Sequence, residues 1–150
     1  LTKPLSRGAF VTAKIIAQVV LLAAATVLGT AICVAMTAFL FDGAAGSRLV
    51  LAVALWFPYA TLLVVVMTLF SAAFRSRGAP GGAGLGFFFL TLLLSSWGPA
   101  ARYGFFGMLP AMGRALLGQP LSAGWPAATT LVAIAAGVAA AVLVFERQEL

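Results

Sequence analysis

Residues 15–41 read IIAQVVLLAAATVLGTAICVAMTAFLF and contain no charged side chain. Three further stretches are also free of charge, at 49–74, 78–101 and 115–145. Each is longer than the roughly 20 residues with which a helix crosses about 30 Å of hydrocarbon. A backbone in lipid must satisfy its own hydrogen bonds, and these runs lack the alternation of barrel strands. The sequence therefore predicts an all-α fold, a polytopic membrane helix bundle with four transmembrane helices.

The composition places the chain in lipid rather than in water. Of its 150 residues, 63% are hydrophobic and 8% are charged, with nine Lys or Arg, three Asp or Glu and no His. A soluble domain is about half apolar and a quarter charged, and a disordered chain is more polar still. With no His and a single Cys, the sequence excludes a Cys/His metal cluster, a His-based catalytic triad and an internal disulfide. We therefore do not expect an enzyme. We also do not expect a nucleic-acid binder, because the cations are spread along the chain and do not form a basic patch.

The four spans are predicted within one transmembrane domain over residues 1–150, at about 15–41, 49–74, 79–98 and 126–145. Three prolines and six glycines interrupt residues 98–125, which are apolar but too broken for one continuous span. We expect a re-entrant or interfacial segment there, at about 103–118, with one or two short helices on the outer side. Its candidate residues are Phe105, Phe106 and Pro110. The final span is expected to begin at Pro126, because proline suits the first turn of a helix.

The cations predict how the spans are oriented. One side of the membrane would hold Lys3, Arg7, Lys14, Arg75, Arg77 and Arg147, and the other Arg48, Arg102 and Arg114. Cytoplasmic loops carry an excess of Lys and Arg, so both termini are expected in the cytoplasm. Trp97, Tyr103 and Trp125 agree with this orientation. They gather at the predicted outer boundary, where amphipathic aromatic rings are favoured.

The acids give a negative prediction about energy coupling. Asp42 lies in a predicted outer turn, and Glu146 and Glu149 lie at the C-terminus, so the spans contain no carboxylate. Transporters driven by protons or sodium usually carry an ionisable relay inside the membrane. A secondary transporter is therefore disfavoured, although ions can also bind to unwound backbone. If the protein moves a solute uphill, we expect the energy to enter from another polypeptide.

Small residues recur at four-residue spacing in three spans. The stripes are Ala25, Gly29 and Cys33; Gly78, Gly82 and Gly86; and Ala133, Gly137 and Ala141. Such stripes let helix backbones approach closely. The glycine stripe is the one most indicative of a function, because Gly weakens a helix and is expected there only where a neighbouring backbone must come close. We interpret it as a candidate packing, dimerisation or gating surface, with ordinary packing within the bundle as the alternative.

Pro58 lies inside the second span, in the sequence Trp56-Phe57-Pro58-Tyr59. Proline removes one backbone hydrogen bond and is expected to kink the helix there. The segment is a candidate hinge or substrate-facing aromatic patch. The alternative is a tolerated kink, since proline is common in membrane helices.

The two ends of the chain carry motifs that resemble those of ABC-2 type transporter permeases. The N-terminal Lys3-Pro4-Leu5-Ser6-Arg7, followed by Lys14, is similar to a KPxSR…K stretch that leads into the third helix of that family. The ending Phe145-Glu146-Arg147-Gln148-Glu149-Leu150 resembles the family's aromatic, basic and acidic terminus. A basic turn at 74–77, a glycine-rich helix and a broken outer segment follow the family's order. The family usually has six spans, so residues 1–150 are expected to be its C-terminal four-helix part.

The resemblance implies a non-enzymatic permease subunit of an ATP-driven exporter in the bacterial inner membrane. Such a subunit forms a homodimer or heterodimer and docks a separate ATP-binding subunit, which alone binds ATP and magnesium, so no cofactor is expected here. The candidate coupling residues on the cytoplasmic face are Lys3, Pro4, Ser6, Arg7, Lys14, Arg75 and Arg77. The alternative for these cations is anchoring to anionic headgroups of the bilayer. The alternative function is a small four-span scaffold or assembly protein without a transport cycle.

Overall fold

The computed structural model of the chain describes residues 7–40, 45–74, 76 and 78–147. About 90% of these described residues are helical, and none of them forms a strand. The all-α class is therefore confirmed for the described chain. Several coupling candidates, Lys3, Pro4, Ser6, Arg75 and Arg77, lie outside the described residues. Arg7 begins the first helix, but its side chain also lies outside what the structure describes.

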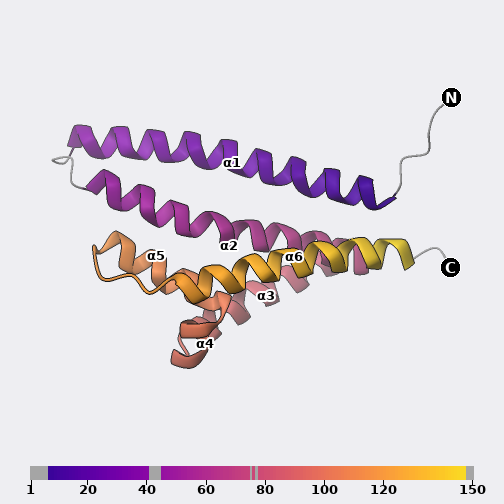
Figure 1. Cartoon of the computed structure of the whole chain (residues 1–150). Coiled ribbons are helices and arrows are strands. Elements are labelled where there is room, and N and C mark those ends of the chain that lie inside the picture. The colour runs from indigo at the N-terminus through magenta and orange to yellow at the C-terminus, as the bar shows by residue number, and fades with distance from the viewer. Residues whose placement is uncertain (1–6, 41–44, 75, 77, 148–150) are drawn as a thin grey trace.

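Three helices are long and apolar enough to cross a membrane. They are α1 (Arg7–Leu40), α2 (Ala45–Ala73) and α6 (Gly124–Arg147). Figure 1 shows them running side by side along the long axis of the molecule, with the start of α1 and the end of α6 at the same end. At 1.5 Å per residue, the 34 residues of α1 extend about 50 Å, so the helix continues well beyond a hydrocarbon core. These helices make the protein a membrane-embedded helical protein.

Helix α3 (Ala79–Ser95) is shorter than the third predicted span. Its 17 residues extend about 25 Å, and the helix ends three residues before the predicted boundary. The chain turns at Ser96 and Trp97, and Trp97 adopts an extended backbone conformation. The following residues, Gly98 and Pro99, begin a new short helix, because proline fits a first helical turn but not a helix interior. Three of the four predicted spans thus have the length of a membrane-crossing helix. The predicted span at 79–98, which corresponds to α3, stays a prediction.

The segment between α3 and α6 is broken into short helices, as the prolines and glycines predicted. It forms α4 (Gly98–Tyr103), the single 3₁₀ turn η1 (Phe105–Gly107) and α5 (Met108–Leu116). Gly118 ends α5 in the left-handed conformation, with φ of 68°. The amide of the next residue, Gln119, then donates to the carbonyl of Arg114 at 2.9 Å. This arrangement is typical of a glycine that terminates a helix.

Helix α2 is the centre of the bundle. Val65 on α2 is fully buried among Val11 and Ile15 of α1 and Ala141 of α6. On its other side, Tyr59 is buried and its hydroxyl lies 2.6 Å from the hydroxyl of Thr91 on α3. Helix α5 also packs on α2, burying one face of its short length. Four other helices therefore pack around α2.

Only the first half of α1 takes part in this core. Val11 and Ile15 are buried, whereas none of residues 20–40 is. Side chains such as Leu21 and Phe39, which are 72% and 89% exposed, point away from the described chain. The second half of α1 therefore leaves most of its apolar surface to lipid or to another helix.

Candidate functional site

Two grooves flank the contact between the second half of α1 and the first half of α2. The smaller groove has a volume of about 320 Å³ and the larger one of about 910 Å³. Both fall within the usual range of small-molecule sites, about 300–1,000 Å³. The smaller groove is lined by Leu22, Ala25, Thr26, Gly29, Thr30 and Cys33 of α1 and by Leu49, Val53 and Trp56 of α2. None of the residues lining either groove is charged.

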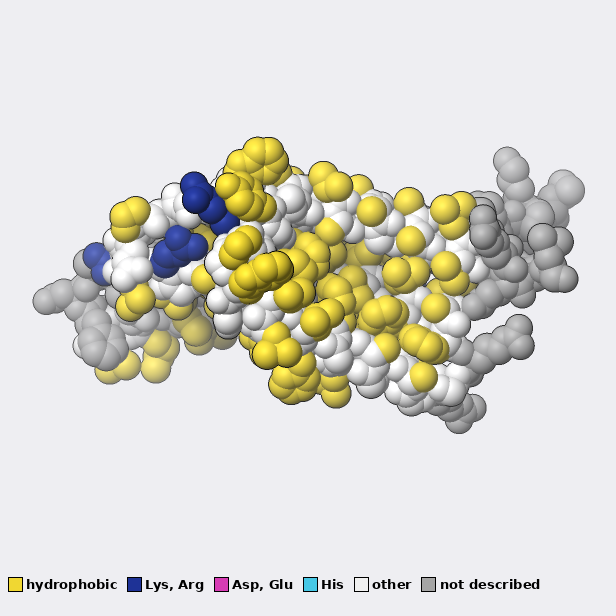
Figure 2. All heavy atoms as spheres, turned by 90° about the horizontal axis from the view of Figure 1, so that it is seen from below, with side chains coloured by type: hydrophobic (Ala, Val, Ile, Leu, Met, Phe, Trp, Pro, Cys, Tyr) yellow, Lys and Arg dark blue, Asp and Glu magenta, His cyan; other side chains and the backbone are white. Residues whose placement is uncertain are grey.

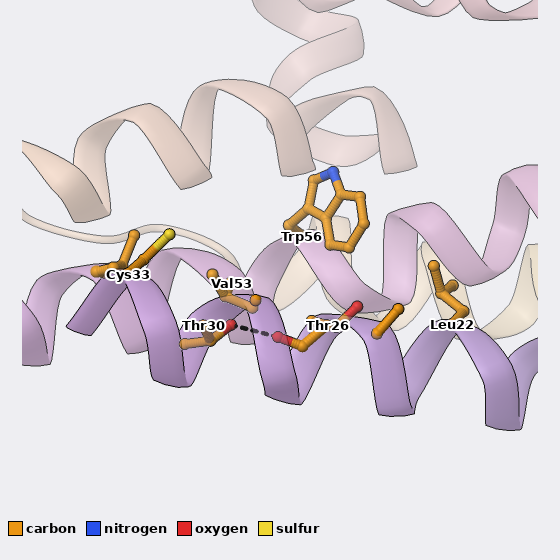
Figure 3. Close-up of a pocket in the computed structure, with 9 residues that line it drawn as sticks. Leu22, Thr26, Thr30, Cys33, Val53 and Trp56 are labelled. Atoms are coloured by element: carbon orange, nitrogen blue, oxygen red, sulfur yellow. Dashed lines mark hydrogen bonds between the residues drawn. The ribbon is translucent and has the colours of Figure 1, made fainter. Parts of the chain in front are cut away.

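The segment Trp56–Tyr59 distributes its side chains over both grooves and the core. Trp56 lines the smaller groove, and Figure 3 shows it on α2 together with the α1 residues that line the same groove. Phe57 and Pro58 line the larger groove, while Tyr59 points into the bundle and pairs with Thr91. Helix α2 continues through Pro58 without a break. The predicted aromatic patch therefore faces two open grooves, and its role as a hinge or substrate surface stays a prediction.

Two polar residues, Thr26 and Thr30, line both grooves. Threonines in helices usually donate to a carbonyl one turn earlier, and Thr30 does so, to the Thr26 carbonyl at 2.7 Å (Figure 3). Within the described chain, the hydroxyl of Thr26 makes no such bond, and the indole N–H of Trp56 has no partner either. Two hydrogen-bonding groups thus remain available in otherwise apolar grooves. The sequence could not distinguish Thr26 from the other threonines of the spans.

A polar contact joins α1 and α2 beside the grooves, one helical turn nearer the start of α1. The hydroxyl of Thr68 donates to the side-chain oxygen of Gln18 at 3.1 Å and lies 2.9 Å from the carbonyl of Val64. Thr68 is buried and Gln18 is exposed. Polar side chains of this kind hold membrane helices together, because lipid provides no hydrophobic drive for their association. The contact fixes α1 against α2 where the grooves begin.

The three small-residue stripes have different surroundings. A Cβ built at Gly78, Gly82 or Gly86 would meet no atom within 4 Å, so this candidate surface makes no close helix contact in the described chain. Its role at a dimer or gating interface stays a prediction. The close approach in α3 occurs instead at Gly84, which packs against Met67 of α2. Spacing alone did not reveal Gly84, because it lies off the four-residue repeat.

The other two stripes differ in how closely they approach α2. A Cβ at Gly137 would be 2.7 Å from a methyl group of Val65, so α6 approaches α2 closely at this glycine. Ala141 on the same stripe is fully buried. The stripe of Ala25, Gly29 and Cys33 lines the smaller groove, and a Cβ at Gly29 would meet nothing within 4 Å. The α6 stripe is therefore a packing surface inside the bundle, whereas the α1 stripe is open.

The outer-segment candidates pack against α3 and against each other. The rings of Phe105 and Phe87 are stacked with centroids 6.2 Å apart, and Phe105 and Phe106 are 4.1 Å apart. Pro110 is half-buried in α5, and its carbonyl accepts a hydrogen bond from Nε of Arg114 at 3.4 Å. Gly107 lies between Ala101 of α4 and the buried Pro126 of α6. The segment is thus a packed unit joined to α3 and α6.

The described cations separate along the long axis. Lys14 is exposed on the half of α1 that is nearer the chain ends. Figure 2 shows Lys and Arg side chains gathered at the other end of the molecule, on the left of the view. The rest of the visible described surface is hydrophobic or uncharged. Arg48, Arg102 and Arg114 are the described cations of that end, on α2, α4 and α5. Which end faces the cytoplasm stays a prediction.

Comparisons with protein-family models, with curated proteins and with solved structures give no match to this chain. The resemblance to ABC-2 permeases therefore rests on the sequence motifs, and the family stays a prediction. Among the described residues, no three His, Cys, Asp or Glu side chains lie close enough together to hold a metal ion. The arrangement offers instead two apolar grooves with few hydrogen-bonding groups, which suit an apolar or amphipathic solute better than an ion.

Proposed function

We propose that the protein is the transmembrane permease subunit of an ABC-2-like ATP-driven exporter. The observation that carries the proposal is the order of the described elements. Two long helices are followed by a short glycine-rich helix, a broken segment packed at one end of α2 and a last long helix. This is the order that the resemblance of the sequence motifs implies, with α3 counted as the third of the four spans.

The uncharged grooves support the energetic part of the proposal. Neither groove is lined by a Lys, Arg, His, Asp or Glu side chain, so the grooves contain no carboxylate or His relay for protons. The energy for a transport cycle would then come from a separate ATP-binding subunit on the face that carries the chain ends. In this proposal both termini are cytoplasmic, and α1, with its exposed second half, contributes to the dimer or to the solute path.

Co-purification from the native membrane tests this proposal. A permease is expected to bring down an ATP-binding protein encoded beside it, in a stoichiometric complex that hydrolyses ATP. Reversing two candidate coupling charges, Lys3→Glu with Arg7→Glu, should release the ATPase while membrane insertion is retained. The matched control is Arg48→Glu with Arg102→Glu, which reverses two charges at the opposite end and should leave the ATPase bound.

The same experiment identifies the alternative. A scaffold without a transport cycle would co-purify with other membrane proteins but not with an ATP-binding subunit. Retention of the ATPase by the Lys3→Glu, Arg7→Glu variant would contradict the coupling role assigned to these residues. Loss of the ATPase from both double variants would point to a general effect of charge rather than a docking face.

A further inference from the structure

Two arginines border one loop at the end of the bundle remote from the chain termini. The loop consists of residues 117–123, between α5 and α6. A Cβ built at Gly118 would lie 2.9 Å from the guanidinium carbon of Arg48, so Arg48 covers this glycine from α2. Arg114 reaches the other part of the loop and donates from Nη1 to the hydroxyl of Ser122 at 3.1 Å. The loop thus brings guanidinium groups from α2 and α5 to the same surface.

Arg102 of α4 adds a third cation at this end. Its guanidinium carbon lies 5.6 Å from the ring centre of the neighbouring Tyr103, within the range of a cation–π contact. Arg102 and Arg48 are both exposed, and neither makes a hydrogen bond within the described chain. Arg114, by contrast, is half-buried and uses its donors on Ser122 and Pro110. Within the described chain, two guanidinium groups therefore have no hydrogen-bond partner.

No acid balances this charge within the described part of the molecule. All the acidic side chains of the chain lie outside the side chains that the structure describes. A free guanidinium presents a planar set of donors that matches the oxygens of a phosphate group. The ligand that complements this end by charge is therefore a phosphate-bearing anion.

The exposed apolar and aromatic side chains at this end favour a phospholipid over a soluble phosphate as the ligand. Trp97, Tyr103 and Trp125 are 62%, 55% and 67% exposed, and Leu117 is 69% exposed. A soluble phosphate or an acidic polypeptide would leave these groups in water. A phospholipid, however, covers both kinds of group at once. Its headgroup meets the guanidinium, and its glycerol and upper acyl chain meet the rings and the leucine.

We propose that this end of the bundle is a binding surface for anionic phospholipid headgroups, with Arg48 and Arg102 as its two free cationic contacts. The surface depends on the membrane-embedded fold but not on the permease function. It also does not depend on which face of the membrane this end occupies. Arg114 holds the loop that Arg48 covers, and the exposed rings set the depth of the lipid.

Lipid retention measures this binding. The protein is purified in micelles containing equal amounts of phosphatidylglycerol and phosphatidylcholine with identical acyl chains, and the retained lipids are counted by mass spectrometry. The unaltered protein should retain phosphatidylglycerol in excess. Each cation near an anionic surface contributes about 1 kcal/mol, so Arg102→Gln should lower the excess about fivefold and Arg48→Gln with Arg102→Gln about twentyfold or more. Arg102→Lys should keep most of it, because the charge remains.

Lys14→Gln is the matched control, because Lys14 is an exposed cation outside this surface. Because Lys14 lies apart from the arginines, Lys14→Gln should lower the phosphatidylglycerol excess by less than Arg102→Gln does. An unchanged excess in the Arg48→Gln, Arg102→Gln variant, or an equal fall in Lys14→Gln, would overturn the proposal. A measurement on the unaltered protein is independent of variant folding: raising salt from about 0.1 M to about 1 M should reduce the excess, because it shortens the screening length from about 10 Å to about 3 Å. A salt-independent excess would also overturn it.

Discussion

Gly107 is the residue at which the broken segment is most tightly enclosed, and Gly107→Ala tests that packing. The backbone of Gly107 is right-handed, with φ of −71°, so alanine meets no conformational barrier there. Its Cβ would, however, collide with the carbonyl oxygen of Ala101 and lie 2.7 Å from a ring carbon of Pro126. Neither neighbour is the end of a flexible side chain. The substitution must therefore move α4 or the start of α6.

The expected loss follows from two opposing effects. Overpacking a close contact costs about 1–3 kcal/mol. Replacing glycine by alanine at a compatible position returns about 0.4–1 kcal/mol, because the unfolded chain loses conformational freedom. The net prediction for Gly107→Ala is a loss of about 1–2 kcal/mol in the free energy of unfolding, measured by SDS titration in mixed micelles. Gly82→Ala is the control, because its Cβ would meet nothing within 4 Å, and it should gain up to about 1 kcal/mol. Equal stability of the two variants would refute the packing assigned to this segment.

Three further substitutions test the interior with the same titration. Tyr59→Phe removes the contact with the Thr91 hydroxyl and should lower the free energy of unfolding by about 0.6 kcal/mol, and by no more than about 1.7 kcal/mol. An unchanged free energy of unfolding would mean that the two hydroxyls do not pair. Gly137→Leu should cost at least about 1–3 kcal/mol, because its side chain would enter the space of the buried Val65, and a neutral result would contradict the close approach of α6 to α2. Thr26→Val should change stability by less than about 0.5 kcal/mol, because the lost hydroxyl makes no bond in the described chain, and a larger loss would reveal a partner.

The sequence predicted the long helices more accurately than their ends. Uncharged runs at 15–41, 49–74 and 126–145 correspond to α1, α2 and α6, because length and lack of charge suffice to recognise a membrane-crossing helix. Helix α1 begins eight residues before its predicted span, because residues 7–14 contain no proline and charges at a helix end do not stop the helix. The predicted end of the third span lies three residues beyond the end of α3 at Ser95, although the following Gly98-Pro99 indicated a break in the helix.

The contacts between helices could not be predicted in the same way. Helices α1, α2 and α3 are apolar on all sides, so their sequences do not indicate which face meets which neighbour. The pairing of Tyr59 with Thr91, the contact at Gly84 and the unpaired hydroxyl of Thr26 all depend on how each helix is rotated. Short helix α5 is the exception, because its small and apolar residues form one distinct face, with Ala111 and Ala115 buried.

The reactivity of Cys33 tests the proposed conformational cycle driven by a separate ATPase, and it does so without knowledge of the substrate. Cys33 is exposed and lines the smaller groove, so a change in the groove's access to water changes its rate of modification. The measurement is the maleimide labelling rate of Cys33, read by peptide mass spectrometry, in native membranes with ATP and vanadate and without nucleotide. If an ATPase drives the cycle, the labelling rate changes with ATP and is insensitive to a protonophore. A rate that is the same with and without ATP, or that responds to the proton gradient alone, would contradict it.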